Sequence, residues 1–185
     1  MVKHERFARL THLLFVVIAL ILFNYANAAK AQSSLSLTST AFAPGSAIPV
    51  DYTCSGSDKS PPLGWRDAPA ATKSFTLVVD DPDAPGGTFV HWAAYNLPAA
   101  ATALSEGVPS AANIPGGGTN GVNNFGHVGY NGPCPPPGKV HHYRIHLYAL
   151  DTTLKLGESA DASAVQAAIK GHVLASAELT GTFSR

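Results

Sequence analysis

Glycine and proline interrupt this chain so often that most of its apolar runs stay short. The 185 residues include 17 glycines and 14 prolines. Proline cannot donate a backbone hydrogen bond, and glycine keeps a freedom that helices and strands must suppress, so both tend to end regular elements. Short apolar runs bounded by such residues are typical of β-strands rather than helices. We therefore expect a mainly β fold.

The residue patterns place strands and one helix along the chain. Alternating or β-rich segments predict strands over 35–39, 74–80, 90–97, 143–150 and 178–183. An Ala-rich segment predicts a helix over 161–169, which Asp161 or Ser163 would cap and Gly171 would end. We find no internal repeat and no second domain boundary.

One connection is unusually long. Residues 113–138 are rich in Gly, Asn and Pro, and a loop of that length in a compact domain is usually functional or disordered. Phe125, His127 and Tyr130 within it favour an ordered, packed loop. Such a loop could line or cover a site.

The N-terminus has the order of a secretory signal. Lys3, Arg6 and Arg9 form a basic start, an apolar run covers 13–23, and small-residue sites end at Ala28 and Ala31. This order predicts a signal peptide over 1–31, cleaved near Ala28 or Ala31, because the apolar run is short for a membrane span. The domain over 32–185 would then be periplasmic or secreted. An uncleaved N-terminal anchor is the alternative.

The charge balance argues against nucleic acid as a partner and leaves membrane contact open. The chain has 12 basic and 12 acidic residues, and removal of 1–31 would leave 8 basic and 11 acidic ones, a net charge of −3. Lys and Arg do not cluster. Nucleic acid is therefore not an expected partner, since phosphate contacts supply most of that affinity. A polybasic patch for anionic lipid surfaces is also absent from the sequence.

Two separated segments carry titratable groups on stiff turns. Residues 80–85 read Asp-Asp-Pro-Asp-Ala-Pro and precede His91-Trp92. Residues 132–138 read Gly-Pro-Cys-Pro-Pro-Pro-Gly and precede His141-His142-Tyr143. Each segment joins a Pro-rich turn to a β-like run with a histidine near its start. Together they indicate a polar site built from carboxylate, imidazole and phenol groups.

Strand alternation indicates which of these groups point inward. Asp81 continues the apolar row of 75, 77 and 79, and a buried carboxylate must be paired or hydrogen-bonded. His141 and Tyr143 begin the row that continues at 145 and 147, whereas His142 and Arg144 lie on the other face. His91 is expected to head a similar row at 93, 95 and 97. The alternative readings are a tight turn over 81–85 and histidines with purely structural roles.

Several chemistries have no motif here. The chain contains no Gly-x-Ser-x-Gly elbow and no zinc-type Cys-x-x-Cys or His-Glu-x-x-His. The glycines at 116–118 are not followed by Lys-Ser/Thr, so they form a loop rather than a phosphate-binding P-loop.

The two cysteines, Cys54 and Cys134, both follow the predicted signal peptide. An exported protein permits a disulfide between them. It would close a loop of about 80 residues and stabilise the fold by roughly 4 kcal/mol in the chain-entropy model. Two buried thiols that never meet are the alternative.

The chain resembles the phosphatidylethanolamine-binding protein (PEBP) family, in its bacterial Raf-kinase-inhibitor-like branch. The resemblance runs from about Leu35 to Phe183. It rests on the segments Tyr52-Thr53-Cys54-Ser55-Gly56, Ser60-Pro61-Pro62-Leu63-Gly64-Trp65, Asp81-Pro82-Asp83-Ala84-Pro85, His91-Trp92, Phe125-Gly126 with Gly129-Tyr130, Gly132-Pro133-Cys134-Pro135-Pro136 and His141-His142-Tyr143.

The resemblance implies two antiparallel sheets packed face to face, with a few short peripheral helices. It also implies an anion pocket for phosphate, acetate or a phosphoethanolamine headgroup. Asp81, His91, His141 and Tyr143 match the family's pocket side chains. Cys134 matches a glycine of eukaryotic members whose backbone N–H meets the anion. The sequence stops at Arg185 without the C-terminal helix that borders the pocket of mammalian members, so their kinase-regulating behaviour is not carried over.

The sequence is compatible with three functions. The first is an exported, non-catalytic domain that binds a small anion or a phospholipid headgroup through imidazolium groups at His91 and His141, the Tyr143 hydroxyl and backbone N–H groups, without a metal or cofactor. The second is an inhibitor or regulator of a kinase or protease through protein–protein contact. The third is a metal-dependent or acid/base hydrolase that uses Asp81, His91 and His141.

Overall fold

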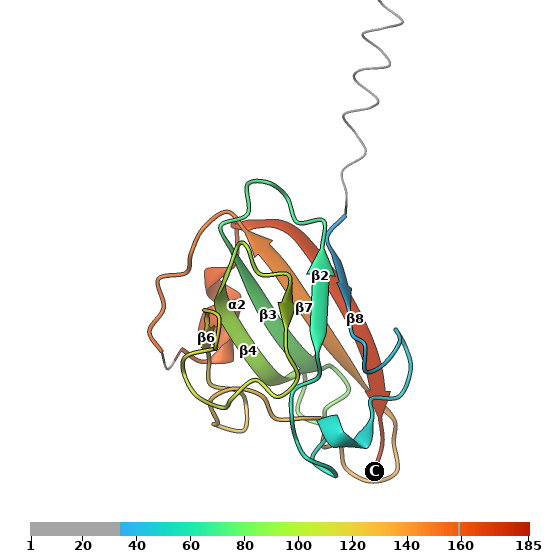
Figure 1. Cartoon of the computed structure of the whole chain (residues 1–185). Helices are drawn as coiled ribbons and strands as arrows, with labels where there is room; N and C mark the ends of the chain where they lie inside the picture. The colour runs from blue at the N-terminus through green and yellow to red at the C-terminus, as the bar shows by residue number, and fades with distance from the viewer. Residues whose placement is uncertain (1–33, 159) are drawn as a thin grey trace, which may run out of the picture. The chain divides into compact units, whose positions relative to one another are not determined.

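Two antiparallel β-sheets carry the fold of this protein (Figure 1). The structure is a computed structural model, and it describes residues 34–158 and 160–185. The predicted signal peptide over 1–31 and its cleavage sites lie outside the described residues. Within the described part, no helix is long and apolar enough to cross a membrane.

The smaller sheet has the strand order β1-β2-β5, and the larger one has the order β6-β4-β3-β7-β8. The elements of the smaller sheet are β1 (Ser36–Thr38), β2 (Leu63–Arg66) and β5 (Ala103–Leu104). Those of the larger sheet are β3 (Ser74–Asp81), β4 (Phe89–Pro98), β6 (Thr119–Asn120), β7 (His141–Leu150) and β8 (Val173–Phe183). The helices are a 3-10 turn, η1 (Val50–Tyr52), and α2 (Ala162–Ala168).

The larger sheet is buried on both faces. One face packs against the smaller sheet around Trp65, Phe75 and Leu147, and the other packs against α2 through Val78 and Val165. Burial on both faces explains why the sequence of β3 reads as a nearly continuous apolar run. The predicted mainly β fold of two packed sheets is confirmed.

The sequence predicts the position of helix α2 closely, but it predicts too late a start for the last strand. The Asp161 side chain accepts a hydrogen bond from the Ala164 N–H at 2.7 Å, so Asp161 is the cap of α2. The last strand begins at Val173, five residues before the predicted start at Glu178. Its first half is rich in Ala and Ser, which have little β propensity, and pairing with β7 makes it a strand nonetheless.

A β-bulge interrupts the pairing of β3 with β4. Val79 pairs with Trp92 and Asp80 pairs with Val90, so His91 is an extra residue in the ladder. A bulge of this kind lets two consecutive side chains point to the same face of the sheet. Trp92 packs in the core between the two sheets, and His91 lies on that side as well.

The row predicted to run from His91 along β4 is therefore wrong. His91 contacts Tyr143 on the inter-sheet side, whereas Ala93 and Tyr95 pack against α2 on the opposite face. A second register shift, nearer the end of β4, returns Leu97 to the inter-sheet core. Simple alternation fails here because each bulge shifts the count by one residue.

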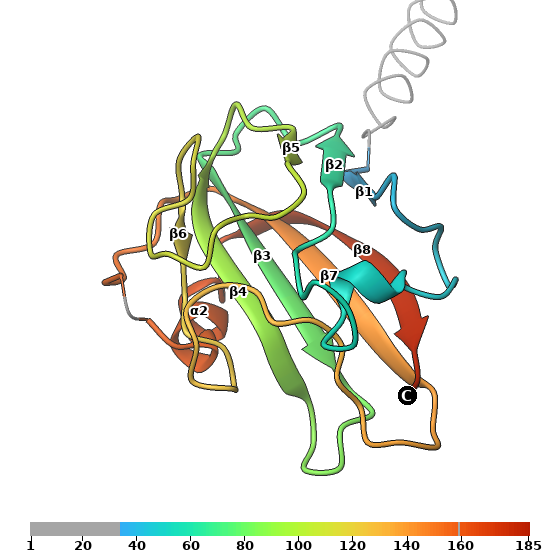
Figure 2. The ribbon, with the colours of Figure 1, turned by 60° about the horizontal axis from the view of Figure 1, so that its bottom comes forward.

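The end of β3 and the beginnings of β4 and β7 meet at one end of the larger sheet (Figure 2). The long loop over 113–138 is packed against this region: the buried Tyr130 donates its hydroxyl hydrogen to the Tyr52 carbonyl at 2.6 Å. The N–H of Asn131 donates to the His91 carbonyl at 3.1 Å. The predicted site residues lie at this end of the sheet, next to the loop.

Candidate functional site

A buried pair of ionisable groups, Asp81 and His141, forms the centre of the site. Strands β3 and β7 are neighbours in register, with Asp80 opposite Arg144, which places Asp81 beside the start of β7. His141 Nδ1 lies 2.7 Å from Asp81 Oδ2, and both residues are at least 96 % buried. Asp81 Oδ1 accepts the Asp83 N–H at 2.8 Å. Because a carboxylate only accepts, the hydrogen lies on His141 Nδ1 and Nε2 is left for other partners.

His91 is held by backbone rather than by a carboxylate. Its Nδ1 lies 2.9 Å from the Asn131 carbonyl oxygen and 3.1 Å from that of Gly132. Burial lowers the pKa of His91, and the Asn131 and Gly132 carbonyls and the charge of Asp81 oppose that shift without cancelling it. His91 therefore favours a neutral ring with its hydrogen on Nδ1.

The loop that holds His91 is itself anchored by Asp58. The Gly132 N–H donates to Asp58 Oδ1 at 2.6 Å, and the Asn131 side-chain amide donates to Asp58 Oδ2 at 3.0 Å. Gly132 fits because a Cβ at this position would collide with the Tyr52 carbonyl. Asp58 thus fixes the two carbonyls that fix the His91 ring.

A disulfide between Cys54 and Cys134 ties the same loop to the segment after η1. The Cys54 N–H also donates to the Pro133 carbonyl at 3.1 Å. The backbone N–H of Cys134 makes no hydrogen bond to another backbone group among the described residues, and it lies close enough to the Tyr143 hydroxyl to lower the pKa of that group. It remains available as a donor.

Tyr143 supplies a buried hydroxyl. The side chain is completely buried, and its oxygen has no hydrogen-bond partner among residues 34–158 and 160–185. Burial raises the pKa of Tyr143, the nearby charge of Asp81 raises it further, and the Cys134 backbone acts in the opposite direction. The phenol therefore keeps its hydrogen, and an unpaired buried hydroxyl leaves a hydrogen bond unmade unless a ligand supplies the partner.

Aromatic rings line one side of the site. The His91 ring meets Phe89, Phe125 and Tyr143 edge to face, with centroids 5.2–5.3 Å apart. Phe125 is 41 % exposed, so the aromatic contacts extend to the surface. No pattern in the sequence indicates a role for Phe89, Asp58 or Asn131.

Three neighbouring side-chain pairs lie outside this group. Asp80 faces the opposite side of β3 and pairs with Arg144 at 2.8 Å and with His146 at 3.4 Å. Burial alone would raise the pKa of Asp80, but the hydrogen bonds from His146 and Arg144 outweigh it and lower that pKa. His142 is exposed and pairs with Asp83 at 2.8 Å. The expectation that His142 and Arg144 face away from the site row agrees with this arrangement.

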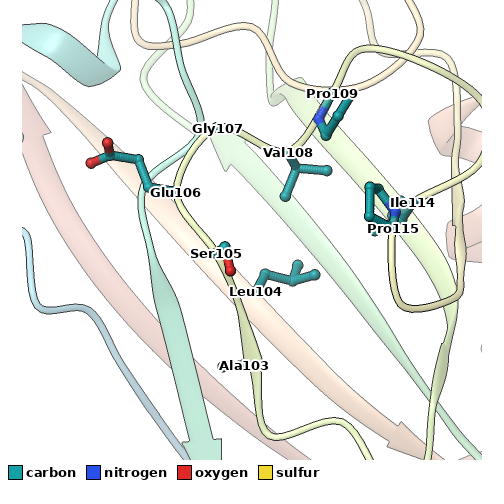
Figure 3. Close-up of a pocket in the computed structure, with 9 residues that line it drawn as sticks. All are labelled: Ala103, Leu104, Ser105, Glu106, Gly107, Val108, Pro109, Ile114 and Pro115. Carbon is teal, nitrogen blue, oxygen red and sulfur yellow. The ribbon is translucent and has the colours of Figure 1, made fainter.

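The described residues contain no group of three or more His, Cys, Asp or Glu side chains placed to hold a metal ion. A separate hollow of about 270 Å³ is lined by residues 103–109, 114 and 115 (Figure 3). Leu104, Val108 and Ile114 surround it, whereas Glu106 points away and accepts from Tyr52 and Lys59. Glu106 is the one ionisable residue in this lining, and none of the predicted site residues lines the hollow.

Comparison with known proteins identifies relatives over most of the chain. A family model described as phosphatidylethanolamine-binding protein matches residues 38–184. The UPF0098 protein of Methanothermobacter thermautotrophicus is 46 % identical over 151 residues, which cover 82 % of this chain and 99 % of that protein.

Two solved structures are similar in both sequence and fold. A crystal structure of a phosphatidylethanolamine-binding protein homologue from Chlamydia trachomatis aligns with a TM-score of 0.74 and 39 % identity, covering 82 % of this chain and 98 % of that one. The structure of E. coli YbcL, described as a new member of the mammalian PEBP family, aligns with a TM-score of 0.76 and 31 % identity, covering 83 % and 99 %.

Proposed function

Because this chain belongs to the phosphatidylethanolamine-binding protein family, we propose that it is an exported domain that binds a small oxyanion and catalyses no reaction. The ligand would be phosphate, a phosphoethanolamine headgroup or a carboxylate. One observation carries the proposal: the completely buried Tyr143 hydroxyl has no partner among the described residues, and it lies beside two histidines whose Nδ1 atoms are already engaged. A ligand oxygen would give that hydroxyl its missing hydrogen bond.

Three donors for such an oxygen come from two segments, strand β7 and the loop before it. Tyr143 donates from β7, the Cys134 N–H donates from the anchored loop, and His141 donates through Nε2 when its ring is an imidazolium. Asp81 accepts from His141 Nδ1 at 2.7 Å and so holds the ring in place. Hydrogen bonds to a charged partner are roughly twice as strong as neutral ones, so a charged His141 is the strongest donor of the set.

The disulfide between Cys54 and Cys134 supports the exported location in this proposal. Disulfides persist in the periplasm and outside the cell, and they are rare in the reducing cytosol. The predicted signal peptide over 1–31 is consistent with that location.

Calorimetric titration with inorganic phosphate and with phosphoethanolamine tests the proposal. The variants are His141→Ala and, as a matched control, His142→Ala, which removes the neighbouring exposed histidine and its own pair with Asp83. We expect saturable binding by the wild-type protein and by His142→Ala. His141→Ala should bind at least about tenfold more weakly, which corresponds to about 1.4 kcal/mol. Equal affinity in the two variants, or no binding by the wild type, would overturn the proposal.

A further inference from the structure

His91 offers the site a hydrogen-bond acceptor rather than a second cationic donor. Its Nδ1 faces two backbone carbonyl oxygens, Asn131 O at 2.9 Å and Gly132 O at 3.1 Å. Carbonyl oxygens carry no hydrogen, so Nδ1 must donate. In a neutral ring Nε2 then bears a lone pair, and Nε2 makes no hydrogen bond to any residue within the described ranges. The geometry thus leaves a bare acceptor on a ring that is 97 % buried.

The charged groups near this ring do not convert it into a cation. Asp81 on β3 is already paired with His141 on β7 at 2.7 Å. Asp58 uses both of its oxygens on the loop amides of residues 131 and 132. Their negative charges raise the pKa of His91 less than burial lowers it. The remaining groups that face the ring are Phe89, Phe125 and Tyr143, and they add no negative charge.

A lone pair on Nε2 discriminates between oxyanions. A ligand oxygen that carries no hydrogen would be repelled by this lone pair, because both atoms are electron-rich. A P–OH group would instead donate a hydrogen bond to Nε2. A phosphomonoester has such a group below its second pKa of about 6, and a fraction of it keeps that group near neutral pH. Sulfate and phosphodiesters carry none. The phosphate of an intact phosphatidylethanolamine molecule is a diester and falls in the second group.

We propose that the site selects an oxyanion that still carries a hydrogen, a phosphomonoester monoanion or dihydrogen phosphate, with His91 Nε2 accepting that hydrogen. The inference rests on the proposed function and narrows it to free phosphate or a free phosphorylated metabolite rather than an intact phospholipid. Tyr143, Cys134 and His141 would donate to the other oxygens of the same ligand.

Calorimetry at pH 6 with four probes tests the selection on the wild-type protein. Phosphoethanolamine and glycerophosphoethanolamine share the ethanolamine group and differ in whether the phosphate is a monoester or a diester, and phosphate and sulfate form the second matched pair. We expect phosphoethanolamine and phosphate to bind, with the diester and sulfate at least about tenfold weaker. Binding of either hydrogen-free probe within threefold of its partner would refute the selection and leave anion binding intact. If none of the four binds, both proposals fail.

The hydrogen position gives a second readout that needs no variant. Imidazole ¹⁵N spectra of the labelled wild-type protein should show His91 hydrogen on Nδ1 and none on Nε2, both without ligand and with saturating phosphate. An Nε2–H signal from His91 in the phosphate complex would overturn the acceptor role. As a further check, His91→Gln offers an amide that can donate as well as accept, so the preference for phosphate over sulfate should fall towards onefold.

Discussion

The disulfide gives the clearest quantitative prediction for stability. It links Cys54 and Cys134 across a sequence separation of 80 residues, so it restricts the unfolded chain strongly. The perturbation is the double variant Cys54→Ser, Cys134→Ser, which removes the link and leaves no free thiol to form an intermolecular bond. In the chain-entropy model a loop of this length contributes about 4 kcal/mol to the free energy of unfolding.

The folded loop should survive the substitution, because other contacts hold it. Asp58 still binds the backbone of Gly132 and the side chain of Asn131, and the Tyr130 hydroxyl still donates to Tyr52. The variant should therefore be less stable mainly because its unfolded chain gains conformational entropy, not because its folded state loses contacts. For a chain of this size, about 4 kcal/mol corresponds to a midpoint lower by roughly 8–16 °C.

Thermal and urea unfolding of the oxidised wild type and the double variant measure this difference. The urea dependence should also steepen in the variant, since an unlinked denatured chain exposes more surface. Wild-type protein treated with reductant should approach the variant. A midpoint of the variant within about 3 °C of the oxidised wild type would refute the entropic reasoning.

Three further predictions concern the histidine, the loop and the far face of the sheet. Because the pKa of His91 is lowered in the folded state, the unfolded state binds more protons than the folded state below pH 6.5. The free energy of unfolding should therefore fall by up to about 1.4 kcal/mol per pH unit on acidification towards pH 5. The variant His91→Gln should flatten that slope. Gly132→Ala places a Cβ 2.8 Å from the Thr53 Cα and should destabilise by about 1–3 kcal/mol in urea unfolding, while Gly86→Ala, with open space around it, should not. Asp80→Ala should lower the free energy of unfolding by about 1–3 kcal/mol, since it leaves partly exposed Arg144 unpaired. The affinity of this variant for phosphate should stay within twofold of the wild type, because Asp80 faces away from the site.

Alternation predicted the site residues on two of the three strands. Strand β7 and the part of β3 that pairs with it have no bulge between them, so a period of two places Asp81, His141 and Tyr143 on the inter-sheet face. Strand β4 has two register shifts, and the extra residue at His91 has no signal in the sequence. The motif His91-Trp92 identified His91 as a site residue, but alternation predicted wrongly which residues of β4 share its face of the sheet.

The role of Asp58 in anchoring the loop beside the site was not predicted, for a different reason. Asp58 acts through the N–H of Gly132 and the amide of Asn131, which lie more than 70 residues away. Contacts between two loops leave no periodicity, and a carboxylate that accepts from backbone looks like any turn aspartate. The only local hint was a glycine at 132 within a rigid Pro-rich segment, which is typical of a close backbone approach.

The multiple anchoring of the loop before β7 has a consequence for the speed of binding. Its residues are tied at Tyr130, at Asn131 and Gly132, and at Cys134 before any ligand arrives. A ligand that finds its donors and acceptors already in place loses little of its binding energy to ordering the protein. Association should then proceed in a single phase without a slow conformational step, and differences in affinity between ligands should appear mainly in their residence times.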